Sequence, residues 1–392
     1  MYGIKINMRS LWVQALIVAL GWQLVMTVLG IVLEHKFTNL DPVTLTPLSH
    51  MQHWDGGWFT SIIANNAYHT NAAAPVFYPL FPLTVTIIQT LSFHMLSITA
   101  AALIVNTLAL WLAVVALAYI CNHFGIAKHR WLVVALFLTS PVAIFLHFVY
   151  AEAIFCALAF WAYLFALRRQ WLAMAVALSL LMIVKIPAIL VIALCGLEFM
   201  RAHQWSPRQI INKNALLFAI VPLGFIGYGW YLQKIGGEFW GMLNGYHHTT
   251  EWSYHVFNPN FMLPIIRAFK TSVLLLFDKV GGYYGAALIG SVLPLAGLVL
   301  LGLASLYAII YLRGKALPLG IAGLLSIVFL SINSNLISVH RYVLPCLILY
   351  VVPVVIIKRY KQLSWSLYAA MFVGCLLQLM LFGFFVSGRF AG

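Results

Sequence analysis

The sequence predicts an all-α protein that crosses a membrane many times, and composition and apolar runs carry this prediction. Of the 392 residues, 64% are hydrophobic and only 8% are charged, and the mean hydropathy is +0.98. Apolar runs close to the length of about 20 residues that crosses a bilayer as a helix recur along the chain. Lipid must therefore solvate most of this chain, which excludes a water-soluble globular fold.

The orientation follows from the basic residues, which outnumber the acidic ones by 22 to 8. Cytoplasmic loops of membrane proteins are enriched in Lys and Arg, and this bias accounts for the net charge without a nucleic-acid partner. Segment 78–96 is ambiguous, because it is apolar enough to cross but begins with Tyr-Pro-Leu-Phe-Pro. If it lies along the outer surface, fourteen of the 22 basic residues face the cytoplasm: Lys5, Arg9, Lys128, Arg130, Arg168, Arg169, Arg201, Arg208, Lys213, Arg313, Lys315, Lys358, Arg359 and Lys361.

Eleven crossings follow, with the amino terminus inside and the carboxyl terminus outside. The expected spans are 10–33, 99–121, 131–149, 153–167, 171–184, 187–200, 214–235, 284–312, 316–333, 343–357 and 364–386. Several are short for a hydrocarbon core of about 30 Å, which indicates a thinned or water-filled region at the outer face.

Three segments are expected to project outward: 34–98, the turn 150–152, and 236–283. The first contains a predicted amphipathic helix with Trp58, Phe59, Ile62 and Ile63 on one face. The third contains a second predicted surface helix with Arg267 and Lys270. We find no internal repeat and no soluble domain boundary, so the chain 1–392 is expected to form one domain.

Cysteine and histidine patterns predict no metal site. Cys121, Cys156, Cys195, Cys346 and Cys375 lie in or beside apolar runs without ligand spacing, and we interpret them as small core residues. The scattered histidines His94, His123 and His147 have no i, i+3 or i, i+4 partner and are expected at the membrane interface.

Four charged residues from different helices are expected at the outer ends of spans: Asp55, Glu152, Lys185 and Arg341. Ionisable groups at membrane depth are costly unless they pair or line a cavity, so their convergence predicts a functional site. The residues expected beside them as substrate contacts are His53, Trp54, Tyr78, Tyr150, His340 and Tyr342.

Each charged residue also has a simpler interpretation. Asp55 suits the cap of a helix that begins at Gly56. Glu152 suits an interfacial helix start, Lys185 suits a counter-ion for either carboxylate, and Arg341 suits a headgroup anchor.

Four motifs in this order resemble the PIG-V-type mannosyltransferases, which belong to the GT-C superfamily of polyprenyl-phosphate-sugar-dependent glycosyltransferases. The motifs are His53-Trp54-Asp55 with Tyr68, the segment Phe77–Pro82, the pair of segments Ser140–Phe145 and Tyr150–Phe155, and the segment His340–Pro345. The chain departs from the family pattern at Lys185, where Arg followed by a small residue is more common. It is also shorter than the eukaryotic members, which suggests a prokaryotic homologue whose acceptor need not be a glycosylphosphatidylinositol precursor.

The resemblance implies a GT-C-like fold with surface helices in the first outer loop, a polyprenyl-phosphate sugar donor and a glycolipid or glycan acceptor. Such a reaction needs a base for the acceptor hydroxyl and cations for the leaving phosphate. Asp55 suits the base, and Arg341 and then Lys185 suit the phosphate, while Glu152 is expected to orient the acceptor or tune Asp55. No cofactor is required, and without an Asp-x-Asp pair a divalent cation is possible but not indicated.

The expected location is a bacterial or archaeal plasma membrane, or the endoplasmic reticulum membrane in a eukaryote, with the active site on the non-cytoplasmic side. A secondary transporter is the main alternative, since ions around a cavity also serve transport. A flippase for a polyprenyl-linked sugar is the second alternative. Transporters usually have two related halves in their sequence, and this chain has none. The polar residues also cluster at one face of the membrane and not at its midplane, which favours the enzyme over the transporter.

Overall fold

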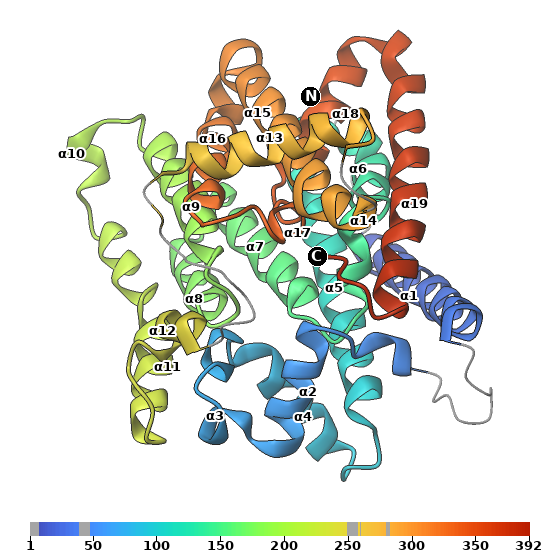
Figure 1. The fold of residues 1–392 in the computed structure, drawn as a ribbon. Helices are drawn as coiled ribbons and strands as arrows, with labels where there is room; N and C mark the ends of the chain where they lie inside the picture. The colour runs from blue at the N-terminus through green and yellow to red at the C-terminus, as the bar shows by residue number, and fades with distance from the viewer. Residues whose placement is uncertain (1–7, 39–47, 249–257, 259, 280–282) are drawn as a thin grey trace.

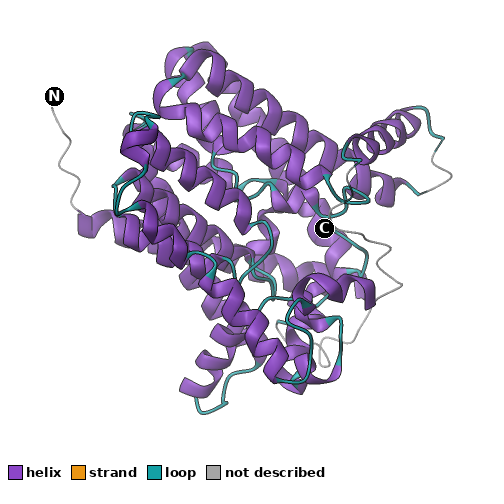
Figure 2. Ribbon diagram, turned by 90° about the vertical axis from the view of Figure 1, so that its left-hand side faces the viewer, coloured by secondary structure: helices purple, strands orange, loops and turns teal. Residues whose placement is uncertain are grey.

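A computed structural model describes residues 8–38, 48–248, 258, 260–279 and 283–392. All regular secondary structure in these residues is helical, as Figures 1 and 2 show, and this confirms the predicted all-α class.

Nineteen α-helices follow one another in the described residues. The first ten are α1 Met8–Thr38, α2 Asp55–Asn65, α3 Ala67–Thr70, α4 Leu80–Leu91, α5 Ile98–His123, α6 Arg130–Leu138, α7 Glu152–Leu167, α8 Trp171–Leu181, α9 Ala188–Ala202 and α10 Pro207–Ile210. The remaining nine are α11 Leu223–Lys234, α12 Gly241–Asn244, α13 Met262–Leu276, α14 Tyr284–Ala287, α15 Leu293–Tyr307, α16 Leu317–Ser331, α17 Val339–Tyr342, α18 Ile348–Arg359 and α19 Ser364–Val386. Short 3-10 and π-helical turns join several of them, including η1 Ser49–Met51 and η4 Pro141–Leu146.

Six segments of the described residues are long and apolar enough to cross a membrane: Arg9–Phe37, Ile98–His123, Ala215–Lys234, Tyr284–Leu312, Gly314–Ser331 and Lys361–Val386. Shorter apolar helices are Leu80–Leu91, Glu152–Leu167 and Trp171–Leu181. The protein is therefore membrane-embedded, and the finer count of eleven crossings stays a prediction.

Proline interrupts the helix within two of the predicted spans, and their crossing of the membrane stays a prediction. Segment 131–149 ends its α-helix at Leu138 and continues as the 3-10 turn η4, which begins at Pro141. Segment 343–357 is helical only from Ile348, after a break that contains Pro345. Proline disfavours helical geometry in the residue before it and removes a backbone donor. The first helix is also longer than predicted and ends at Thr38, so Glu34 lies in a helix and not in a loop.

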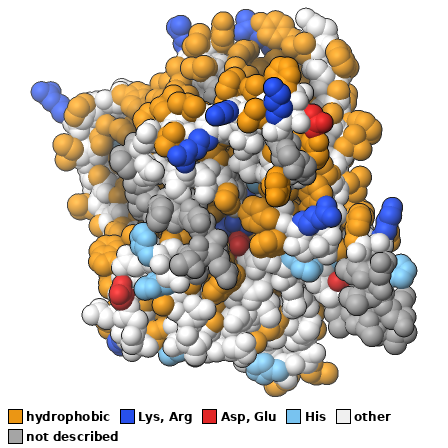
Figure 3. Space-filling view, viewed as in Figure 1, with side chains coloured by type: hydrophobic (Ala, Val, Ile, Leu, Met, Phe, Trp, Pro, Cys, Tyr) orange, Lys and Arg blue, Asp and Glu red, His pale blue; other side chains and the backbone are white. Residues whose placement is uncertain are grey.

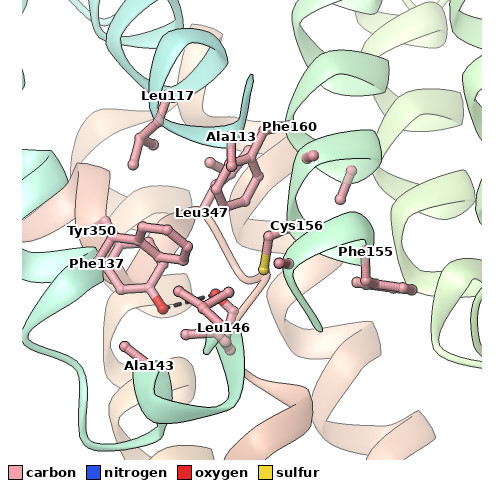
Figure 4. Packing of buried hydrophobic residues seen from close by; sticks show 14 of the residues in the cluster. Ala113, Leu117, Phe137, Ala143, Leu146, Phe155, Cys156, Phe160, Leu347 and Tyr350 are labelled. Carbon is pink, nitrogen blue, oxygen red and sulfur yellow. Dashed lines mark hydrogen bonds between the residues drawn. The ribbon is translucent and has the colours of Figure 1, made fainter. Parts of the chain in front are cut away.

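The core is built around α5 and α7. Helix α5 packs against α1, α4, α6 and α7, and α7 also contacts α8 and α9. In the part of the core that Figure 4 shows, Phe137 meets the rings of Phe160 and Tyr350 edge to face, with ring centroids 5.5 and 5.4 Å apart. The same packing layer extends through η4 to the segment that carries Glu152.

Helices α2, α3 and α4 gather at one end of the bundle, whereas α13 lies across its flank against α15 and α16 (Figure 1). The predicted amphipathic helix is α2, which buries Phe59 and Ile62. The predicted second surface helix is α13, which carries Arg267 and Lys270. The two predicted surface helices therefore do not lie together.

Candidate active site

Both acidic residues of the predicted site stand at the first position of a helix. Asp55 begins α2 and Glu152 begins α7, where the helix dipole favours negative charge. The prediction that Asp55 caps the helix is wrong, because Trp54 occupies the cap position and no side chain caps this helix. The Asp55 carboxylate instead faces Arg341.

The four predicted charged residues come together as one cluster. Arg341, in the short helix α17, places Nη1 2.8 Å from Asp55 Oδ2 and Nε 3.1 Å from Glu152 Oε1. Lys185, in the turn between α8 and α9, donates a short hydrogen bond to the same oxygen of Glu152. The cluster thus pairs two carboxylates with two cations and is neutral as a whole.

Arg341 keeps unused hydrogen-bonding capacity within these ion pairs. Its side chain is only 4% exposed, yet Nε and Nη1 make no well-directed hydrogen bond to any described residue. A poorly directed hydrogen bond is weaker than a well-directed one, and a guanidinium suits the paired oxygens of a phosphate. The geometry therefore leaves Arg341 able to take an anionic ligand.

Aromatic rings hold the guanidinium in place. Its carbon lies 5.3 Å from the ring centre of Phe145, 5.2 Å from that of Tyr150 and 5.5 Å from that of Tyr342. The Tyr150 hydroxyl also accepts a hydrogen bond of 3.2 Å from the backbone N–H of Asp55. Tyr150 thus fixes the positions of Arg341 and Asp55 relative to each other.

A cavity of about 350 Å³ opens beside the cluster, a volume within the usual range for small-molecule sites. Asp55, Lys185 and Arg341 are among its lining residues. In the space-filling view, charged side chains of both signs appear at the bottom of a recess in this face (Figure 3).

Aromatic residues line much of the remaining wall: Trp54, Trp58, Phe59, Phe77, Tyr78, Tyr246, Phe329, Tyr342 and Phe390. Trp58 stacks on Phe77 with ring centroids 5.2 Å apart. Of these residues, the sequence singled out Trp54, Tyr78 and Tyr342 as substrate contacts, and it missed the others. Trp58 and Phe77 belong to the quoted motifs or their immediate extension, which was the available signal.

Four of the predicted site residues do not line the cavity. Glu152 lies behind Arg341 and Lys185 and is 5% exposed. Tyr150 is fully covered, and His53 packs edge to face on Phe385. His340 is buried, and its Nε2 lies 3.1 Å from the carbonyl oxygen of Ala391. These residues support the wall of the site.

Two lining residues have backbone conformations that side chains rarely adopt. Trp54 has φ 56° and Ser338 has φ 63°, and they immediately precede α2 and α17. Such strain persists where surrounding structure imposes it, often at functional sites. Here it places Asp55 and Arg341 opposite each other.

A second buried polar group lies next to the cluster, and the sequence did not predict it. We call it the histidine chain; its members are Gln23, Glu34, Ser49, His50 and His147. His147 is fully buried in the protein, and its expected depth at the membrane interface stays a prediction. His50 Nε2 lies 3.0 Å from His147 Nε2, and His147 Nδ1 lies 2.7 Å from Gln23 Oε1.

The hydrogen bonds fix the tautomers in the histidine chain. Gln23 Nε2 donates to the carbonyl of Leu146, which leaves its Oε1 as an acceptor for His147 Nδ1–H. His147 Nε2 then accepts, and His50 Nε2 donates. Ser49 donates to Glu34, whose carboxylate lies 3.9 Å from His50 Nδ1.

The surroundings of His50 keep it neutral, and α1 packs closely against its ring. Burial lowers the pKa of His50 to about 4, and nearby His53 lowers it further in the same direction. A Cβ added at Gly30 of α1 would overlap the His50 ring. The close approach of α1 to this ring therefore requires glycine at position 30.

Among the described residues, no three His, Cys, Asp or Glu side chains gather as metal ligands. No protein-family model matches the chain, and no curated protein matches it at the threshold of significance.

Proposed function

We propose that this protein is a membrane glycosyltransferase, of the mannosyltransferase kind, that moves a sugar from a polyprenyl-phosphate donor to a glycolipid or glycan acceptor. The main observation behind this proposal is the ion pair between Asp55 and Arg341, whose Oδ2 and Nη1 atoms lie 2.8 Å apart. Both residues lie on the wall of one cavity that is also lined by aromatic side chains. A base next to an anion-binding group is what displacement of a phosphate from a sugar needs.

The donor phosphate replaces Asp55 as the partner of Arg341. Arg341 and Lys185 then face the phosphate oxygens, and Asp55 is free to accept a proton. The acceptor oxygen attacks the anomeric carbon while its proton passes to Asp55. The bond from the anomeric carbon to the phosphate oxygen breaks, and the polyprenyl phosphate leaves with the bonding electrons.

A single displacement inverts the anomeric configuration, and the position of Glu152 supports this outcome. A retaining mechanism needs a second carboxylate as nucleophile at the sugar. Glu152 does not line the cavity, and it contacts Lys185 and Arg341. Its role in the proposal is to hold both cations in place.

The proposed arrangement in the membrane has eleven crossings and a GT-C-like fold, with the site on the non-cytoplasmic side of a prokaryotic plasma membrane or of the endoplasmic reticulum. Helix α4 has 12 residues and spans about 18 Å at 1.5 Å per residue, which is short for a core of about 30 Å. The Lys and Arg side chains visible in Figure 3 lie mostly over the half of the face away from α2 to α4. Both observations support an outer location for α4.

Transfer by the purified protein tests the enzyme against a transporter or flippase. The protein in detergent is given polyprenyl-phosphate mannose with a radiolabelled sugar and a crude glycolipid acceptor fraction. The proposal expects label in the acceptor and release of polyprenyl phosphate, both lost in Asp55→Asn. Movement of the donor across vesicles without any transfer would overturn the enzyme in favour of a flippase.

Cysteine labelling tests the arrangement in the membrane. In a variant with Cys346 and Cys375 replaced by Ser, a membrane-impermeant maleimide added outside should label Thr90→Cys and leave Lys128→Cys unlabelled. The reverse pattern would contradict the proposed orientation.

A further inference from the structure

Tyr78, which lines the cavity, packs with buried Tyr228 and half-buried Tyr68 in one group, and the three differ in how their hydroxyl groups are used. Tyr228 donates to the carbonyl of Pro75 at 2.9 Å, and Tyr68 donates to the carbonyl of Phe77. Tyr78 packs on Tyr228 with ring centroids 5.5 Å apart, but its hydroxyl has no hydrogen-bond partner among the described residues.

Tyr78 is a wall residue of the cavity, and its hydroxyl is buried within that wall. Tyr78 is 2% exposed and lines the cavity. Burial raises the pKa of Tyr78, so the phenol stays protonated and can donate. An unsatisfied buried hydroxyl is unfavourable, so a fold that keeps one in a cavity wall gains from a polar ligand there.

The structure assigns Tyr78 a specific role that rests on the proposed function: we propose that its hydroxyl hydrogen-bonds a hydroxyl group of the transferred sugar. Tyr78 would then be a specificity-determining contact for the glycosyl part of the donor, distinct from the phosphate contacts of Arg341 and Lys185.

The connection between Tyr78 and Lys185 supports the donor sugar as the partner. The backbone N–H of Leu80 donates to the carbonyl of Ile183 at 3.0 Å, which ties the segment of Tyr78 to the turn of Lys185. Both side chains line the same cavity. A group bonded directly to a phosphate at Lys185 and Arg341 therefore comes within reach of the wall formed by Tyr78.

Paired lipids separate the sugar contact from the phosphate contact. Binding of polyprenyl-phosphate mannose and of polyprenyl phosphate is measured on purified protein through thermal stabilisation, since a ligand of the folded state raises its melting temperature. The variants are Tyr78→Phe and the matched control Tyr228→Phe, which removes a hydroxyl already bonded within the protein.

We expect Tyr78→Phe to melt without ligand at or slightly above the wild-type temperature, because it removes an unsatisfied group, while Tyr228→Phe melts lower. Tyr78→Phe should bind the mannosylated lipid roughly 3- to 10-fold more weakly, the usual effect of one neutral hydrogen bond, and bind polyprenyl phosphate as the wild type does.

Equal binding of the mannosylated lipid by the wild type and Tyr78→Phe would overturn the inference, and so would an equal loss for both lipids. An effect that appears only when an acceptor is added would also overturn it, in favour of an acceptor hydroxyl. If neither lipid stabilises the wild type, the proposed function itself fails.

Discussion

The histidine chain and the charged cluster are two buried polar groups that both draw residues from segments 48–56 and 147–152, and they differ in their access to the cavity. In the histidine chain, His50 Nε2, His147 and Gln23 bond one another and a backbone carbonyl, and none of them lines the cavity. His50 Nδ1 has no hydrogen-bond partner among the described residues and lies 3.9 Å from the Glu34 carboxylate. In the charged cluster, Arg341 forms ion pairs without well-directed hydrogen bonds from Nε and Nη1, and three members face a cavity. The comparison teaches that the polar group away from the cavity holds the fold, and that the polar group on the cavity wall is available to a ligand.

The strongest test of this contrast is Asp55→Asn in the charged cluster. This change keeps the volume of the side chain and removes the base, so transfer should fall by a factor on the order of 10²–10⁴. Donor binding should survive, because Arg341 loses a competing anion. The measurements are the rate of sugar transfer and the melting temperature. Near-normal turnover would show that Asp55 is not the base and would break the assignment of this cluster as the active site.

Arg341→Lys tests whether Arg341 of the charged cluster binds the donor phosphate. Lysine keeps the charge but replaces a planar fork by a point charge, so it cannot contact two phosphate oxygens in the same way. Loss of one charge-assisted hydrogen bond weakens donor binding by about 1.5–3 kcal/mol. The dissociation constant for polyprenyl phosphate measures this effect. An unchanged constant would remove Arg341 from the phosphate site.

Gly30→Ala tests how tightly His50 of the histidine chain is packed, through its effect on the stability of the protein. The added methyl would overlap the His50 ring, and overpacking of this kind typically costs about 1–3 kcal/mol. Gly21→Ala is the control in the same helix, since a Cβ at Gly21 has no described atom within 4 Å. We expect a lower melting temperature for Gly30→Ala and an equal or higher one for Gly21→Ala. Equal melting of the two variants would show that His50 is not tightly held.

The pH dependence of melting gives the smallest expected effect. The pKa of His50 is about 4 in the folded protein and 6.5 for an ordinary histidine, so between these values the unfolded chain binds more protons. Stability therefore falls as the pH is lowered from 6.5 to 4. His53 and His340, whose pKa values burial also lowers, act in the same direction.

His50→Gln isolates the contribution of His50 to this pH dependence, because the amide can still donate to His147 but does not titrate. Its melting temperature should fall less than that of the wild type over this pH range. Identical pH profiles would show that His50 takes no part in the acid sensitivity.

The helical class and the charged cluster were predictable from the sequence. The apolar composition predicts the helical class, and the rarity of charged residues at the ends of spans predicts the cluster. The breaks at 139–147 and 343–347 were marked by Pro141 and Pro345, but the apolar runs continue through them. The histidine chain was not predictable. Gln23, His50 and His147 lie far apart in the sequence with no common spacing, and only packing brings them together. The unpaired hydroxyl of Tyr78 depends in the same way on which neighbouring carbonyls are already taken.

The backbone N–H of Val149 donates to the carbonyl of Met51 at 3.1 Å, and this bond joins the two segments that carry the acidic residues. Together with the contact between His50 and His147, it holds those segments without help from Arg341. In the proposed reaction, a phosphate that takes Arg341 away from Asp55 would therefore leave the backbone where it is. The conformational entropy of ordering the site has already been lost during folding, so the binding of substrate does not have to supply it. Only the Asp55 side chain needs to turn.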